Sequence, residues 1–92
     1  MAYIQAELGR KGEAVKNYLK AIDLFYSHAF YNEVDSFAAK VLEIDRGNVE
    51  ASCYLAANAY RKDDKKLYEK YRTDAERRGG HIATARIEEL LK

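Results

Sequence analysis

Apolar residues recur at steps of three and four along most of this 92-residue sequence, and proline is absent. That spacing places apolar side chains on one face of an α-helix, so it predicts helices. The clearest stripe consists of Ala14, Val15, Tyr18, Ile22, Phe25 and Ala29. No segment alternates apolar and polar residues for long enough to indicate a β-strand. We therefore expect an all-α protein.

Short breaks divide the sequence into six predicted helical segments. A short helix over residues 2–8 should end in the stretch from Gly9 to Gly12, and a long helix should follow over residues 13–29. Further helices are expected over residues 33–44, 49–61, 65–78 and 81–92. Because the breaks are short, consecutive helices must pack antiparallel to each other.

Residues at the breaks indicate how the helices begin and end. Asn32 and Asn48 each precede a predicted helix, where the side-chain oxygen can accept a hydrogen bond from a free N–H group. An aspartate of the break at residues 62–64 should cap the next helix in the same way. Gly47 and the Gly79–Gly80 pair follow predicted helices, and we expect Gly47 to adopt the left-handed conformation that closes one.

Length and charge exclude several classes of protein. The 92 residues make one domain at most, which we place over residues 1–92. The net charge is +1, from 16 basic and 15 acidic residues, so we predict no nucleic-acid partner and no membrane partner. No apolar run is long enough to cross a membrane and no signal peptide is visible, so we expect a cytoplasmic location. We also expect the chain to be a fragment of a larger protein.

Patterns typical of catalysis or metal binding are missing from the sequence. Gly9 and Gly12 follow no predicted strand and precede no Lys-Ser/Thr pair, so they do not indicate a phosphate-binding loop. His28 and His81 have no partner at metal-ligand spacing, and Cys53 has no histidine nearby. We therefore predict no enzymatic activity, no cofactor and no metal. Cys53 is interpreted as a small residue that lets helices pack closely.

Three patterns in the sequence resemble the tetratricopeptide repeat (TPR), a pair of antiparallel helices that recurs every 34 residues. In residues 13–24, the family's second-helix pattern A-x3-F-x2-A is matched by Ala14, Tyr18 and Ala21. A second pattern covers both helices of a repeat and consists of Tyr18, Ala21, Ile22, Phe25, Val34, Ala38 and Val41. A step of 34 residues gives the third, which consists of Ser52, Leu55, Ala56, Ala59, Tyr68, Arg72 and Ala75.

The register of these patterns stays open. Residues 13–29 can be the second helix of one repeat or the first helix of the next, and both assignments predict the same antiparallel neighbours. The third pattern departs from the family at Tyr68 and Arg72, where a small and an aromatic residue are usual. We expect Tyr68 to fill the space that Ala59 leaves.

The resemblance implies a short, right-handed, TPR-like solenoid of stacked helix pairs, with residues 81–92 as a capping helix. It also implies a concave groove, lined by the first helices, that binds a peptide or a helix of a partner protein. The residues expected to line this groove are Leu19, Lys20, Asp23, Tyr26, Tyr54, Ala57, Tyr60 and Arg61. Tyrosine and arginine are frequent at the energetic centres of interfaces, which supports this assignment.

Two alternatives accompany the groove hypothesis. The tyrosines at positions 26, 54 and 60 can instead pack across to the neighbouring helix as part of the core. The chain can also be a structural spacer or a self-association segment of a larger repeat protein, in which case a homo-oligomer is expected.

Overall fold

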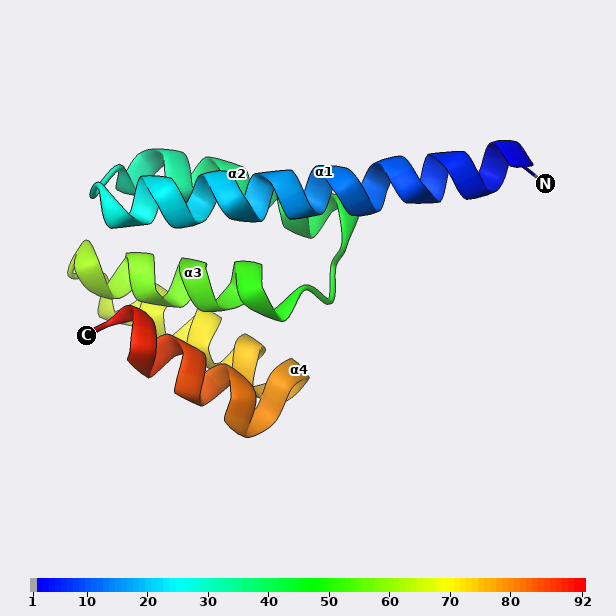
Figure 1. Cartoon of the computed structure of the whole chain (residues 1–92). Helices are drawn as coiled ribbons and strands as arrows, with labels where there is room; N and C mark the ends of the chain where they lie inside the picture. The colour runs from blue at the N-terminus through cyan, green and yellow to red at the C-terminus, as the bar shows by residue number, and fades with distance from the viewer. Residues whose placement is uncertain (1) are drawn as a thin grey trace.

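The regular structure of this protein is entirely helical over the residues that the computed structural model describes. The model describes the backbone of residues 2–92 and the side chains of residues 10–92. The helices are α1 (Ala2–Ser27), α2 (Tyr31–Ile44), α3 (Val49–Arg61) and α4 (Lys65–Leu90) (Figure 1). The predicted all-α class is therefore confirmed.

α1 is longer than the sequence predicts. It continues through Gly9 and Gly12, so the expected end of a first helix at residue 8 is wrong. No proline interrupts this stretch, and a glycine inside a helix costs only about 1 kcal/mol. The N-terminal end of α1 extends beyond the other helices (Figure 1).

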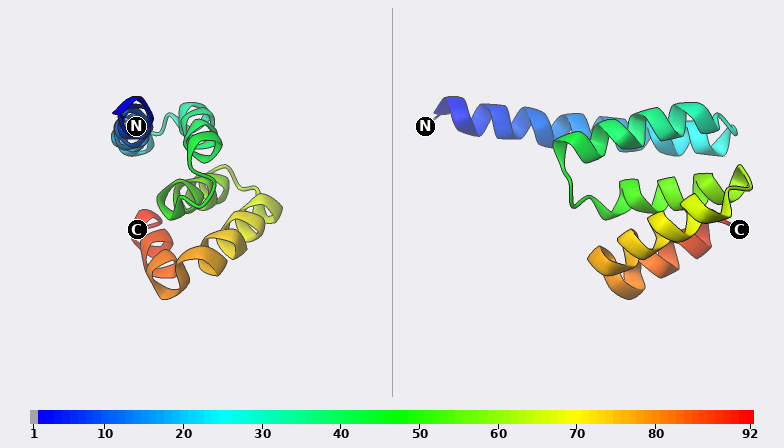
Figure 2. Two further views of the ribbon diagram at one scale, coloured as in Figure 1. Left: turned by 90° about the vertical axis from the view of Figure 1, so that its right-hand side faces the viewer. Right: turned by 180° about the vertical axis from the view of Figure 1, so that it is seen from behind.

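α4 bends sharply at Gly80, whose φ of 58° and ψ of −136° lie outside the helical region. This bend confirms the predicted break at Gly79–Gly80. It divides α4 into a first arm (residues 65–79) and a second arm (residues 81–90), which turn back on each other (Figures 1 and 2). A Cβ atom on Gly79 would lie 2.7 Å from Cγ1 of Val49, so the absence of a side chain lets α4 approach the start of α3.

The side chains of Asn48 and Asp64 cap the helices as predicted. Oδ1 of Asn48 accepts from the Ala51 N–H at 2.9 Å, and Oδ1 of Asp64 accepts from the Leu67 N–H at 3.2 Å. These bonds satisfy N–H groups that the first turn of a helix leaves free.

Two expectations about helix ends are wrong. α2 begins at Tyr31, one residue before the expected cap at Asn32, and Phe30 at the cap position makes no side-chain hydrogen bond. Asn32 instead accepts from the Lys62 ammonium at 3.0 Å. Gly47 does not adopt a left-handed conformation, because α2 ends at Ile44 and the C-cap residue Asp45 is already extended.

α3 lies at the centre of the molecule. It packs against α1 and α2 on one side and against both arms of α4 on the other (Figure 2). Residues 51–59 are all buried, because most of their side chains are small enough for helices to approach α3 from every side. α1, α3 and the second arm of α4 run in the same direction, and α2 and the first arm run in the opposite one (Figures 1 and 2).

Two apolar clusters form the core. The first joins α1, α2 and α3 and contains Ile22, Val34, Ala38, Val41, Ala51, Tyr54 and Leu55. The second joins α3 and α4 and contains Cys53, Ala56, Ala75, Ala83 and Ile87. Tyr71 and Leu90 contact both clusters, so the two halves of the molecule share a continuous core.

The turn between the helices of each antiparallel pair repeats after 34 residues. Ala29 and Asp63, at positions that differ by 34, have positive φ values of 63° and 62°. The residue that follows each of them donates its N–H to a carbonyl five residues earlier. The Phe30 N–H donates to the Phe25 carbonyl at 2.8 Å, and the Asp64 N–H donates to the Ala59 carbonyl at 2.9 Å. The turns of the α1–α2 and α3–α4 pairs are therefore equivalent, and residues 13–27 belong to the first helix of a pair.

Candidate functional site

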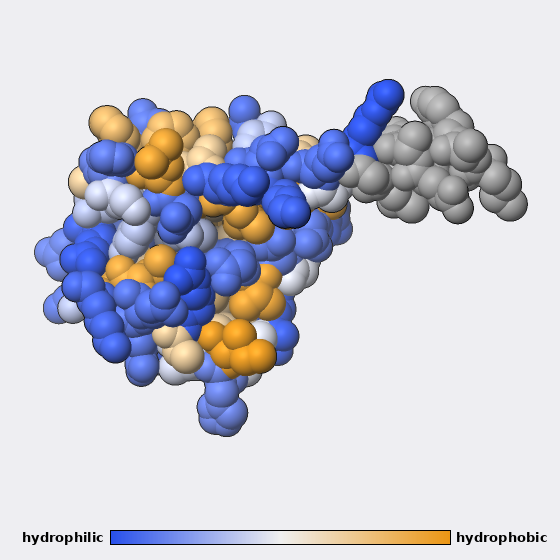
Figure 3. Space-filling model, viewed as in Figure 1, coloured by the Kyte–Doolittle hydropathy of each residue, from blue (hydrophilic) through white to orange (hydrophobic). Residues whose placement is uncertain are grey.

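α1, α3 and the second arm of α4 surround a hollow of about 500 Å³ near their C-terminal ends. We call it the concave hollow. Its lining consists of Asp23, Tyr26, Ser27, Ala29, Tyr31, Arg61, Arg86, Glu89 and Leu90. Figure 3 views this face and shows a mainly hydrophilic surface with separate hydrophobic patches. Three of the eight predicted groove residues, Asp23, Tyr26 and Arg61, meet in this hollow.

Tyr54 and Ala57 face the same side of the molecule but are buried. Their exposed fractions are 2% and 0%, so their side chains are largely closed to a partner and their assignment to a binding surface is corrected. Tyr54 is covered because α1 crosses over it, with the Tyr26 and Tyr54 rings 5.9 Å apart. For Tyr54 the core alternative is therefore the correct one.

The remaining predicted residues lie outside the hollow. Tyr60 is exposed, but it is about 120° around the helix from Tyr54 and packs against Tyr68 with ring centroids 5.3 Å apart. Leu19 packs against the first apolar cluster, and Lys20 is exposed on α1. The 34-residue pattern thus predicted the helix pairs, but it did not show which helix faces are buried by neighbouring helices and which are exposed.

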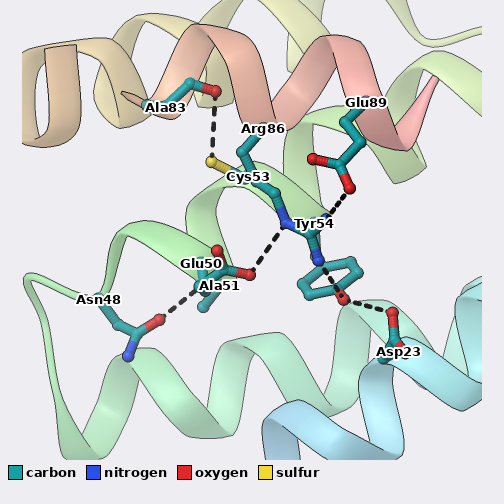
Figure 4. A network of polar contacts seen from close by, with 9 residues as sticks. All are labelled: Asp23, Asn48, Glu50, Ala51, Cys53, Tyr54, Ala83, Arg86 and Glu89. Carbon is teal, nitrogen blue, oxygen red and sulfur yellow. Dashed lines mark hydrogen bonds and ion pairs between the residues drawn. The ribbon is translucent and has the colours of Figure 1, made fainter. Parts of the chain in front are cut away.

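A polar network centred on Arg86 joins the three helices that form the hollow (Figure 4). The Tyr54 hydroxyl donates to Oδ1 of Asp23 at 2.8 Å and accepts from Nη2 of Arg86 at 3.1 Å. The same guanidinium pairs with Glu50 at 3.3 Å and with Glu89 at 3.2 Å. One arginine of α4 therefore connects acidic groups and a tyrosine from α1, α3 and its own helix.

Burial and charge fix the protonation states in this network. Burial and the hydrogen bond to Asp23 raise the pKa of Tyr54, so its hydroxyl keeps its proton. Burial lowers the pKa of Arg86, but Glu50, Tyr54 and Glu89 together raise it by more, so the net pKa is raised and the guanidinium stays charged. Because its side chain is only 26% exposed, Arg86 acts mainly as an internal connection.

A second set of polar contacts lies at the end of the hollow. The Tyr26 hydroxyl donates to the Leu90 carbonyl at 2.8 Å and accepts from Nε of Arg61 at 3.2 Å. The Arg61 guanidinium also reaches the Leu90 carbonyl at 3.4 Å. The Arg61 guanidinium therefore lies at the C-terminal end of α4, where a helix carries partial negative charge. The hydrogen bond from Arg61 to Tyr26 raises the pKa of this arginine, whose side chain remains largely exposed.

Sequence reasoning missed six of the lining residues, of which Arg86 and Glu89 carry charge; the other four are Ser27, Ala29, Tyr31 and Leu90. Residues 81–92 were expected only to cap the array, with a polar outer face. The sequence did contain a signal, because Arg86 and Glu89 follow the predicted break at Gly79–Gly80. A helix after that break runs parallel to α1 and α3 and can line the same surface. On such a helix Arg86 and Glu89 are about 60° apart and share one face.

Two observations on the described side chains concern metal binding and thiol reactivity. No group of three or more metal-ligating side chains occurs among them. Cys53 is buried and its Sγ donates to the Ala83 carbonyl at 3.7 Å. Burial raises the pKa of the Cys53 thiol from 9.0 to about 11, so it is not a thiolate nucleophile at neutral pH. None of the described helices is both long and apolar enough to cross a membrane.

No protein-family model matches the chain, and neither a characterised protein nor a solved structure is detectably similar to it. Function is therefore inferred from the 34-residue repeat and from the residues that line the concave hollow.

Proposed function

We propose that this chain is a TPR-like protein-interaction module that acts by binding a peptide or helix of a partner protein, not by catalysis. The observation that carries this proposal is the 34-residue repeat of the turns at Ala29 and Asp63. The same interval separates successive tetratricopeptide repeats. Stacked helical repeats of this type form concave surfaces used for binding, and the second arm of α4 would be the capping helix.

The lining of the concave hollow supports a protein ligand. Tyr26 and Tyr31 supply aromatic surface, and Arg61 supplies an exposed guanidinium beside them. Tyrosine and arginine have rigid or planar groups that bind with little loss of conformational entropy. We expect an acidic residue of the ligand to contact Arg61, while apolar parts of the ligand lie against the tyrosines.

Self-association is the second candidate function, because large apolar side chains are exposed at one end of the α1–α2 pair. Leu24 is 59% exposed and Phe30 is 53% exposed. Such residues could stack on further helices or on a second copy. A molecular mass that rises with concentration, and that falls in a Leu24→Gln/Phe30→Gln variant, would support this alternative.

Selection from a displayed peptide library tests the proposed function. Peptides enriched on the wild-type chain should bind the Arg61→Glu variant about tenfold or more weakly. The matched control is Lys70→Glu, which makes the same charge change at an exposed residue of α4 outside the hollow. Lys70→Glu should keep the wild-type melting temperature. Arg61→Glu loses the bonds of Arg61 to Tyr26 and to the Leu90 carbonyl, so affinities are compared well below its melting temperature. Failure to enrich any peptide, or equal affinity for all three chains, would contradict the concave hollow as the binding site.

A further inference from the structure

A second and more apolar hollow lies on the opposite side of α3, between α2 and the first arm of α4. Its volume is about 750 Å³. We call it the α2–α4 groove. Its apolar walls are formed by Ala39, Leu42, Leu67 and Tyr71, and its floor by Leu55 and Ala59, which are only 5% and 4% exposed. None of these residues lines the concave hollow, so the two surfaces are separate.

The first helix pair shows what occupies the equivalent position. There, Phe25 lies between Phe37 and Phe30, with ring centroids 5.2 and 6.2 Å apart. Both contacts are edge-to-face, which is a favourable geometry for aromatic rings. The first pair therefore fills this position with a cluster of three aromatic side chains of its own.

The second helix pair lacks that cluster. A step of 34 residues from the three phenylalanines gives Ala59, Asp64 and Tyr71, and all three line the α2–α4 groove. The methyl group of Ala59 thus stands where the first pair has the ring of Phe25. Tyr68 does not fill the space as the sequence suggested, because its ring packs against Tyr60 and the second apolar cluster. The groove includes the position that the Phe25 ring occupies in the first helix pair.

Charged residues at the edge of the groove favour a basic ligand. Asp35 is already paired with the Lys62 ammonium at 2.7 Å. Of the remaining charged lining residues, Glu43 and Asp64 are acidic and Arg46 is basic, which leaves one negative charge in excess. A positively charged side chain of a ligand would compensate it.

We propose that the α2–α4 groove binds a segment of a partner protein that inserts one aromatic side chain beside Ala59 and places a basic side chain near Glu43. The inserted ring takes the position that Phe25 occupies in the first helix pair. This interaction does not depend on the concave hollow and adds a second binding surface to the module.

Synthetic nonapeptides test this proposal by NMR. The first peptide has a central phenylalanine flanked by lysines, the second has glutamates in place of the lysines, and the third has alanine in place of the phenylalanine. The first should cause saturable shifts of the Ala39, Ala59 and Leu67 methyl signals. The second should bind more weakly by about fivefold. The third should cause no saturable shift. A first peptide without saturable shifts at these methyls, or a third that binds equally well, overturns the proposal.

Two variants distinguish groove binding from non-specific contact. Ala59→Phe places a ring of the chain itself in the groove, so it should abolish binding of the first peptide. Glu43→Lys, at an exposed residue, should weaken that binding by about fivefold and keep the melting temperature. Lys70→Ala, outside the groove, should bind as the wild type does. If Ala59→Phe fails to fold, Glu43→Lys still decides: unchanged affinity in that variant contradicts the proposal.

Discussion

Tyr54 belongs to the core and holds in place two residues that line the concave hollow, Asp23 and Arg86. Its ring is almost fully buried, while its hydroxyl bonds to Asp23 of α1 and to Arg86 of α4. A buried hydroxyl without a hydrogen-bond partner would destabilise the fold, so Asp23 and Arg86 stabilise it by bonding to the Tyr54 hydroxyl. The sequence could identify Tyr54 as a residue of the concave side, because helical spacing is local. Its burial depends on α1 and α4, which come from distant parts of the sequence.

The buried thiol of Cys53 makes stability depend on alkaline pH. The unfolded thiol loses its proton near pH 9.0, whereas the folded thiol has a pKa of about 11. Because the folded pKa is raised, the stabilisation is complete below pH 9 and is lost as the pH rises toward 11. Between pH 8 and pH 10 this group should lower the free energy of unfolding by about 1 kcal/mol.

The Cys53→Ala variant isolates this effect. Urea unfolding at pH 8 and pH 10 should show that the variant loses less stability over this interval than the wild type, whatever its stability at pH 8. Every other titratable group is common to the two chains, so its contribution cancels in the comparison. An identical loss in the two proteins would show that the Cys53 thiol is not shielded from water.

At the scale of the helices, local signals predicted the breaks and long-range packing decided the rest. Asn48 and Asp64 cap their helices because the capping bond spans only three residues. Asn32 has the same capability, but the distant Lys62 binds its side chain, and α2 begins at Tyr31, two residues earlier than expected. The glycines of α1 were expected to break a helix and instead lie within one, since glycine alone does not enforce an end.

Gly80 and Gly12 should respond in opposite ways to replacement by alanine. In both positions an added Cβ would meet nothing within 4 Å, so the backbone conformation alone should decide the outcome. Gly80→Ala should destabilise the fold by about 1–3 kcal/mol, because its φ of 58° with a ψ of −136° is accessible almost only to glycine. Gly12→Ala, inside α1, should stabilise it by up to about 1 kcal/mol.

Thermal and urea unfolding of the two variants check this prediction, with the wild-type chain as the reference. A Gly80→Ala chain as stable as the wild type would mean that the sharp bend in α4 is absent in solution. The second arm would then not return to α3, and the concave hollow would lack Arg86 and Glu89.

At the scale of the whole molecule, the second arm of α4 completes both the core and the candidate site. Its Ala83 and Ile87 side chains cover Cys53 and Ala56 in the second apolar cluster, and its Leu90 carbonyl accepts from α1. Deletion of residues 81–92 should therefore cost at least about 3 kcal/mol of stability, mainly from exposed apolar surface.

Reactivity of Cys53 with a thiol reagent provides a second measurement on the same deletion. The shortened chain should react rapidly at pH 8, whereas a control that lacks only Lys92 should stay protected. Equal stability and equal protection of the two chains would mean that the second arm does not pack on α3.

The sequence predicted most of the fold but only part of the site. Helix spacing and the 34-residue interval are properties of neighbouring residues, and they gave the helix pairs and their order. The concave hollow required knowledge of which helices lie side by side, so Asp23, Tyr26 and Arg61 were identified while Arg86 and Glu89 were not. The family resemblance placed Tyr60 in the groove, but its ring packs against Tyr68 on another face of α3.

The most direct test of the proposed function is the NMR footprint of a library-selected peptide on the labelled wild-type chain. The proposal predicts shifts in the backbone signals of Asp23, Tyr26, Arg61 and Glu89, which lie on three different helices and line one hollow. Signals of the α2–α4 groove should stay unchanged with this peptide. Shifts confined to that groove, or to the exposed Leu24 and Phe30 at the end of the first helix pair, would contradict the concave hollow as the binding site.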